Sequence, residues 1–249
     1  MQTNLLNHNR LSIPDEPKLI PGSSNFSAPA NLSLPETWLE ALSTDAPVAK
    51  ALAKIWKPLA VYVPQAVERI IKCTLQLGLA IYPDEDQDIR VNLLYIFQSQ
   101  DKDNLAVGWF AGYPATDEVI AEAQARLSII LPASYKKFIR VHNGFNLYPI
   151  DVGPCMANSL HFIRELAQAD QVFEHQANRF LAFSGDGAGN QQCYDLTIPL
   201  ANSDYLTFDW DHETRQIAKP MSFFAYVEDL MMTELETARL RKNDKLNRP

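Results

Sequence analysis

The chain has 249 residues, of which 47% are hydrophobic and 21% are charged, and its formal net charge at pH 7 is −8. This composition favours a folded protein over a disordered one, and no apolar run is long enough to span a bilayer. The first residues lack the pattern of a secretory signal, so we expect a cytoplasmic protein. The three cysteines are widely spaced and form no C-x-x-C pair, which argues against a disulfide framework or a zinc site.

The charge is unevenly distributed along the chain. Residues 239–249 carry five basic residues against Asp244, a net charge of +4, which leaves −12 on the rest. An acidic body repels nucleic acid and membrane surfaces but attracts a basic protein. We therefore expect a protein partner, with no role for nucleic acid or membrane. The basic tail suits the end of a helix, where cations complement the helix dipole.

The N-terminal part of the chain predicts a leader followed by helices. Residues 1–32 are rich in Asn, Ser and Pro without a sustained period, which indicates a flexible leader. Ser33 and Glu36 have the spacing of a capping box and predict the start of a first helix. A second helix follows Asp45 and stops before Pro58.

A third helix and a hairpin complete this part. The helix is predicted to begin at Pro64 and to carry its apolar stripe as far as Leu75, before Gly78. The runs "IRVNLLYIF" and "LAVGWFAGY" flank the polar "QSQDKDN" and predict a β-hairpin. We interpret residues 33–115 as an accessory helical and β-hairpin region.

Residues 116–238 predict an α+β domain. Thr116 is a good N-cap for one helix, and "LPASYKKFIRVHNG" predicts a second helix with His142 packed on its apolar face and bonded to a backbone group. The runs "RFLAFS", "QQCYDL", "YLTFDW" and "RQIA" then predict four strands. Ser222 caps a long C-terminal helix. Strands grouped between helices imply an antiparallel sheet packed with helices.

The glycine-rich stretch "FLAFSGDGAGNQQCYDL" (residues 180–196) raises the question of a phosphate or metal site. A dinucleotide loop needs a helix after its glycines, whereas "QQCYDLTIP" has the texture of a strand, and a P-loop needs a Lys that is absent. Counted as a calcium loop from Asp186, the stretch lacks the glycine and the bidentate glutamate that such a loop needs. We therefore predict a hairpin turn, built by glycine with Asp and Asn beside it, and no cofactor.

A second stretch, "DYLTFDWDHETR", gathers acidic residues and one histidine. On a strand, Tyr205, Thr207 and Asp209 share one face, so the acids divide between a solvent face and the following turn. This favours turn chemistry with an acidic rim over a metal or acid–base cluster. Cys155, six residues before His161, is a candidate thiol nucleophile, but no residue of the sequence orients the imidazole.

The order of these features resembles the SUKH superfamily, which includes the yeast cell-wall regulator group (SMI/KNR type) and many bacterial immunity proteins. The resembling stretches are "LPASYKKFIRVHNG", "FLAFSGDGAGNQQCYDL", "YLTFDWDHE" and "SFFAYVEDLM", in this order within about residues 116–238. The resemblance implies an α+β fold without catalytic residues that acts by binding another protein. In bacteria such proteins typically neutralise a toxin.

The leading hypothesis is thus a non-catalytic immunity protein that binds a basic toxin domain, since complementary charge speeds encounter. The alternatives are a regulatory scaffold in cell-wall or signalling control, and a hydrolase that uses Cys155 or the cluster of Asp209, Asp211 and His212. The residues predicted to bind the partner lie on the sheet face and its turns: Asp186, Asn190, Asp209, Asp211, His212 and Glu213.

Overall fold

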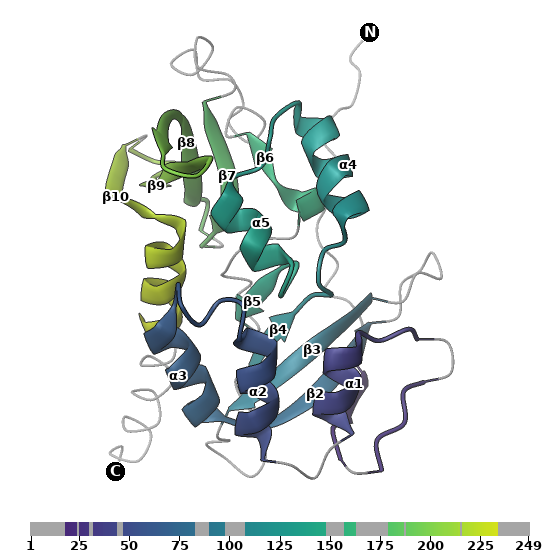
Figure 1. The fold of residues 1–249 in the computed structure, drawn as a ribbon. Helices are drawn as coiled ribbons and strands as arrows, with labels where there is room; N and C mark the ends of the chain where they lie inside the picture. The colour runs from purple at the N-terminus through teal and green to yellow at the C-terminus, as the bar shows by residue number, and fades with distance from the viewer. Residues whose placement is uncertain are drawn as a thin grey trace, which may run out of the picture.

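The computed structural model has an α+β fold with two five-stranded antiparallel sheets among the described residues (Figure 1). The structure describes residues 18–23, 25–29, 32–43, 47–82, 90–97, 108–147, 157–162, 179–186, 188–214 and 216–233. The predicted basic tail, Cys155 and Asp45 lie outside these ranges. Within them, no helix is both long and apolar enough to cross a membrane.

The first sheet, sheet A, is an antiparallel meander in which each strand pairs with the next one along the chain. The predicted hairpin is confirmed, because β3 and β4 pair from Leu93↔Ala111 to Ile96↔Gly108. The strands of sheet A are β1 (Lys18–Pro21), β2 (Thr74–Tyr82), β3 (Arg90–Phe97), β4 (Gly108–Ala111) and β5 (Phe145–Leu147).

Two strands of sheet A differ from the sequence-based expectation. The helix that begins at Pro64 ends at Cys73, because the backbone turns extended at Thr74 and the next residues pair with β3 as β2. Its apolar stripe was predicted to continue to Leu75, which is instead a strand residue with 57% of its surface exposed. Within the predicted flexible leader, Lys18–Pro21 form β1, which pairs with β2.

The second sheet, sheet B, is also antiparallel, with the order β10-β9-β8-β7-β6. The four strands predicted from residue 179 onward are all present, and β8 directly follows the glycine-rich turn. The hairpin prediction is therefore confirmed, since no helix begins after Asn190. The strands of sheet B are β6 (His161–Phe162), β7 (Phe180–Gly185), β8 (Gln191–Leu200), β9 (Asp204–Trp210) and β10 (Ile217–Ser222).

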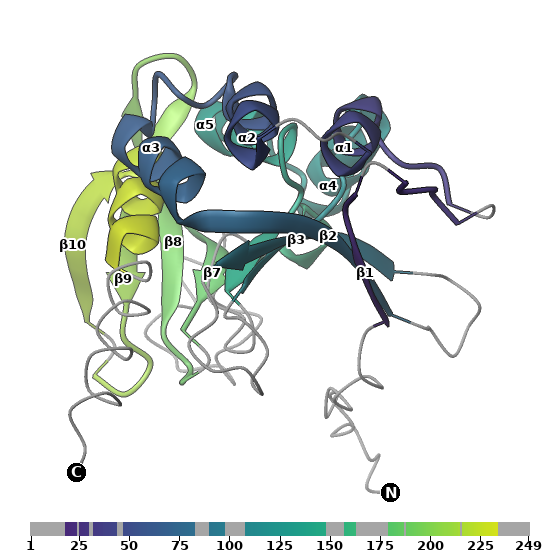
Figure 2. The same cartoon turned by 90° about the horizontal axis from the view of Figure 1, so that it is seen from below.

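The helices lie on one side of the sheets (Figure 2). Thr116 caps α4 by accepting a hydrogen bond from the Val119 amide, and Ser222 caps the C-terminal helix in the same way through Ala225, as predicted. The predicted cap at Ser33 is wrong, because the first helix begins at Glu36 with Pro35 in the cap position. The helices are α1 (Glu36–Leu42), α2 (Val48–Trp56), α3 (Pro64–Cys73), α4 (Asp117–Leu127), α5 (Ala133–Ile139), the 3-10 turn η1 (Ala157–Ser159) and the C-terminal helix, residues 223–233.

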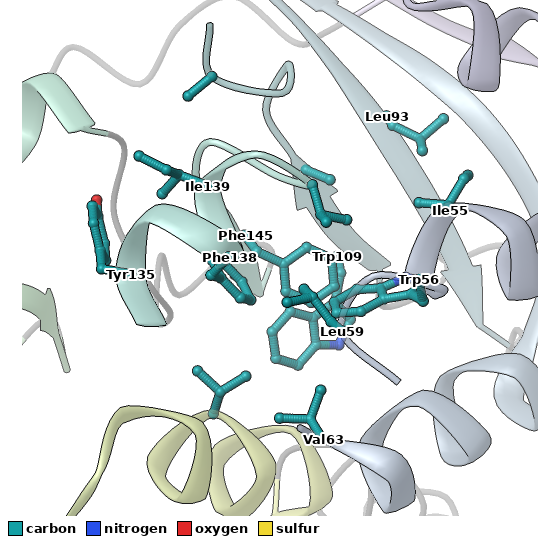
Figure 3. Close-up of a cluster of buried hydrophobic side chains, with 14 of the residues drawn as sticks. Ile55, Trp56, Leu59, Val63, Leu93, Trp109, Tyr135, Phe138, Ile139 and Phe145 are labelled. Atoms are coloured by element: carbon teal, nitrogen blue, oxygen red, sulfur yellow. The ribbon is translucent and has the colours of Figure 1, made fainter. Parts of the chain in front are cut away.

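One hydrophobic core joins the two halves of the chain. Trp56 of α2 and Phe138 of α5 converge on Phe145 of β5, which stacks on Trp109 of β4 with ring centroids 4.6 Å apart (Figure 3). All four side chains are at most 1% exposed. Burial of aromatic rings of this size is a large contribution to stability, so residues on both sides of position 115 share their main source of folding free energy.

A buried polar chain crosses the same core. The indole of Trp56 donates to the Tyr95 hydroxyl at 3.1 Å, and this hydroxyl lies 2.8 Å from His142 Nε2. Burial lowers the pKa of His142 to about 3. The packed histidine is confirmed, but its place on the helix is wrong, because α5 ends at Ile139. Its Nε2 partner is the Tyr95 side chain, which the sequence did not indicate.

Two further contacts join the C-terminal helix to the N-terminal region. The carboxylate of Glu228 accepts hydrogen bonds from the amides of Gln65 (2.9 Å) and Ala66 (3.2 Å), at the N-terminus of α3. Tyr62 stacks on Phe224 with ring centroids 4.6 Å apart. Pairing of β4 with β5 also crosses the boundary expected between residues 115 and 116, which stays a prediction.

Candidate functional site

The first element of the candidate site is the turn between β7 and β8. Its aspartate, Asp186, accepts hydrogen bonds from the amides of Ala188 (2.8 Å) and Asn190 (3.1 Å), and from the Asn190 side chain (2.7 Å). The Asp186 amide in turn donates to the Asn190 carbonyl. Short polar side chains that bond nearby amides are what tight turns use. The Asp186 carboxylate therefore stabilises the conformation of this turn in the free protein.

The second element is the turn between β9 and β10. Oδ1 of Asp211 accepts hydrogen bonds from the amides of Thr214 (2.8 Å) and Glu213 (2.9 Å), and the Asp211 amide donates to the Gln216 carbonyl. The Thr214 amide is the largest cause that lowers the pKa of Asp211. This carboxylate is therefore ionised at neutral pH, which suits a hydrogen-bond acceptor and not a general acid.

The two turns lie side by side, because they extend from neighbouring strands that pair at Gln191↔Trp210. Oδ1 of Asn190 accepts a hydrogen bond from the His212 amide at 3.1 Å and lies 3.0 Å from His212 Nδ1. Gly189 has φ = 110°, and a Cβ atom there would lie 2.9 Å from His212 Nδ1. The close approach of the turns therefore requires glycine at position 189.

Between the turns lies a cavity of about 310 Å³. Its floor includes Gln192, Asp209 and Ala218, which form one cross-strand row of β8, β9 and β10. Asp209 is the partly exposed carboxylate of this row, with 32% of its side chain accessible and its Oδ2 3.5 Å from Lys219 Nζ. The complete lining is Asp186, Asn190, Gln192, Asp209, Trp210, Asp211, Thr214, Gln216 and Ala218.

The structure thus brings together the residues predicted to bind a partner. Four of them line the cavity, namely Asp186, Asn190, Asp209 and Asp211, while His212 and Glu213 are exposed on the second turn. We call these six residues the acidic turn surface. The face of Asp209 was expected to be a solvent face, and this is wrong: Thr207, on the same face, is 1% exposed because the face packs on the core.

The sequence did not indicate the neutral lining residues. Gln192 and Gln216 are single glutamines without a motif around them, and Gln192 also accepts a hydrogen bond from the Tyr226 hydroxyl at 3.3 Å. Trp210 lies on the opposite face of β9 from Asp209, where it packs with Phe180, Ala182 and Cys193. The period-two alternation of β8 is the one signal that places Gln192 on the same face as Tyr194.

The lining is rich in hydrogen-bond acceptors and lacks a nucleophile with an oriented base. The imidazole of His212 contacts Asn190, and the Asp211 carboxylate is occupied by turn amides. Among the residues that the structure describes, no three His, Cys, Asp or Glu side chains are grouped closely enough to hold a metal ion. Cys155, the candidate nucleophile considered in the sequence, lies outside those residues. The geometry suits recognition of a cationic group by carboxylates.

Comparison with protein families gives a match for the part of the chain that holds this site. Residues 114–226 match the model of the SMI1 / KNR4 family (SUKH-1). This segment is a SUKH-1 family domain, which confirms the resemblance seen in the sequence. Comparison with curated proteins and with solved structures gives no match.

Proposed function

We propose that the protein is a non-catalytic, cytoplasmic binding module that neutralises a basic toxin by direct binding, with the acidic turn surface as its contact. The family supports this proposal, because the SUKH-1 match is consistent with an immunity-protein role. Three carboxylates around one cavity, those of Asp186, Asp209 and Asp211, are the observation that carries it. Such a site attracts a basic partner and orients it.

The cavity suggests how the partner is anchored. Ligand pockets span roughly 300–1,000 Å³, and this cavity, at about 310 Å³, is at the small end of that range. A cavity of this size has room for one long side chain. We infer that an arginine of the toxin enters it, since a planar guanidinium pairs with carboxylates through two hydrogen bonds. Neutralisation would then follow from occlusion of the toxin surface around this arginine.

The test must separate binding from folding. Asp186 and Asp211 support the turns, so their substitution would disturb the surface itself. Glu213 is exposed, and Asp209 meets only Lys219 among the ion pairs of the described residues. The informative variants are therefore Asp209→Asn and Glu213→Gln.

The measurement is surface-binding kinetics with the purified toxin domain encoded beside the gene. Asp209→Asn should raise the dissociation rate about tenfold, the equivalent of about 1.4 kcal/mol, because it removes a carboxylate from the anchor. Glu213→Gln should slow association by a few fold at low salt only, since exposed charges act through screened, long-range attraction. Two controls with the same charge change, Glu122→Gln for Glu213→Gln and Asp229→Asn for Asp209→Asn, lie on exposed helix faces and should bind as the wild type does.

The outcomes separate the hypotheses. Unchanged kinetics in both variants at every salt concentration would exclude the acidic turn surface as the contact. A gene neighbourhood without a toxin, together with binding to a cell-wall or signalling protein, would favour the regulatory scaffold. Hydrolytic activity abolished by Asp211→Ala or Cys155→Ala would favour an enzyme.

A further inference from the structure

The chain carries a second charged surface, of opposite sign. Residues 47–67 and 123–147 contain no Asp or Glu, although the chain as a whole has a net charge of −8. Together these two segments contribute +7, so the rest of the chain has −15. Their basic residues are Lys50, Lys54, Lys57, Arg126, Lys136, Lys137 and Arg140.

The fold places these segments next to each other. Figures 1 and 2 both show α2, the turn after it and α5 as neighbours, and the rings of Trp56 and Phe138 meet between them at 6.5 Å. The apolar sides of both helices face this contact, so their lysines face outward. We call the accessible side chains of this region, of which Lys136 is half-buried and the others are exposed, the basic surface: Lys50, Lys54, Lys57, Val61, Tyr62, Lys136 and Lys137.

An ordered aromatic group lies within the basic surface. One face of Tyr62 stacks on Phe224, Lys137 Nζ lies 4.4 Å from the Tyr62 ring centroid, and the same amine donates to the Tyr62 hydroxyl at 2.6 Å. Beside it, Val61 is 79% exposed. A side chain that is held in place before binding loses little conformational entropy on binding, and an exposed apolar residue gains from burial.

Most of the positive charge on this surface is not neutralised locally. Lys54 pairs with Glu40 at its edge, in an exposed contact that is worth little. Within the described part of the chain, Lys50, Lys57 and Lys136 form no ion pair. Clustered charges of one sign raise the local concentration of a partner of the other sign.

The basic surface and the acidic turn surface lie at opposite ends of sheet B. The hairpin tip of β8 and β9 contacts the start of α5, where the Ala133 amide donates to the Ser203 carbonyl. The acidic turns extend from the other end, beyond Gln191 and Trp210. The seven residues of β9 alone separate the two ends by roughly 20 Å at about 3.3 Å per residue. Both surfaces are therefore accessible to different partners at the same time.

We propose that the basic surface is a second protein-binding surface, whose partner is a short acidic segment with an apolar side chain between its carboxylates. The carboxylates meet the lysines, and the apolar side chain packs on Val61 and Tyr62. A compact acidic segment fits better than nucleic acid, because a long polyanion would extend beyond the basic surface and be repelled by the rest of the protein, whose net charge is −15. This proposal rests on different residues from the proposed toxin contact and is independent of it.

The test uses a labelled synthetic peptide of glutamates around a central leucine, with fluorescence anisotropy as the readout. We expect the double variant Lys50→Glu with Lys57→Glu to bind this peptide about tenfold more weakly at low salt, because two exposed attractions become repulsions. Neither lysine has an ion pair to lose, so the fold should be unaffected. Lys18→Glu, an exposed lysine on the edge strand β1, is the control and should bind normally.

Further arms identify the partner class. Val61→Ser should weaken peptide binding by about threefold at both low and high salt, because this variant loses the burial of an apolar side chain, which salt does not screen. Asp209→Asn should leave peptide binding unchanged, which keeps this result separate from the toxin contact. The proposal is overturned if no variant changes the affinity, or if an oligonucleotide or anionic vesicles bind the wild type more tightly than the peptide does. Self-association that is lost in the double variant would overturn it in favour of a second copy of the chain.

Discussion

The buried imidazole of His142 makes the stability of this protein depend on pH above the range in which carboxylates titrate. In the folded state its Nε2 lies 2.8 Å from the Tyr95 hydroxyl, and burial holds its pKa at about 3. In the unfolded chain the pKa returns to about 6.5. The unfolded state therefore binds a proton that the folded state refuses, so stability is complete above pH 6.5 and is lost as the pH falls toward 3.

The size of the effect follows from these two values. Between about pH 7.5 and about pH 5.5, protonation of the unfolded chain at this one residue should lower the free energy of unfolding by about 1.4 kcal/mol. Carboxylates contribute little in this interval because their ordinary pKa values lie near 4. In His142→Gln the side chain does not titrate, so this variant should be less stable at the higher pH but lose about 1.4 kcal/mol less on acidification.

The assay is urea unfolding followed by tryptophan fluorescence at the two pH values. Phe145→Leu serves as the control, because it weakens the same core without removing a titrating group and should keep the full pH dependence of the wild type. If the wild type and His142→Gln lose the same stability between the two pH values, His142 is not held neutral in the folded protein. That result would refute the buried hydrogen-bond network that runs from Trp56 through Tyr95 to a neutral His142.

Three other changes test contacts that join the fold. Glu228→Ala should lower the free energy of unfolding by about 1–2 kcal/mol, because two amides of α3 lose their acceptor, whereas exposed Asp229→Ala should not. Asp195→Asn should lower the free energy of unfolding, measured in urea, by about 3 kcal/mol or more, because the Asp195 carboxylate is 1% exposed and pairs with the Arg179 guanidinium at 2.6 Å. Gly189→Ala should cost about 1–3 kcal/mol and shift the NMR signals of His212, and unchanged signals would contradict the close approach of the two turns.

The helices and the hairpins were predictable where their signals are local. Asp and Glu after Thr116 start α4, and apolar runs on both sides of a polar or glycine-rich stretch predict a hairpin. The end of α3 was not predictable in this way. An apolar stripe continues past Cys73, and only pairing with β1 and β3 makes the following residues a strand.

The candidate site was predictable in part for the same reason. Asp186 and Asp211 bond to amides two to four residues away, so the chemistry of each turn is written in its own stretch of sequence. The cavity between the turns is not local. It depends on the registers of β8, β9 and β10, which bring Gln192 and Gln216 beside these aspartates.

The sequence by itself determined the fold class, most of the helices and strands, and the family of residues 114–226, because each of these depends on spacing within short segments. Only the tertiary structure decided how the two halves combine. The Glu228 carboxylate accepts hydrogen bonds from α3, more than 160 residues earlier in the chain. Strand β5 pairs with the sheet of the N-terminal region, and two lysine-rich segments form one surface. Contacts between distant residues are selected by the packing of the whole core, and no short stretch of sequence carries that information.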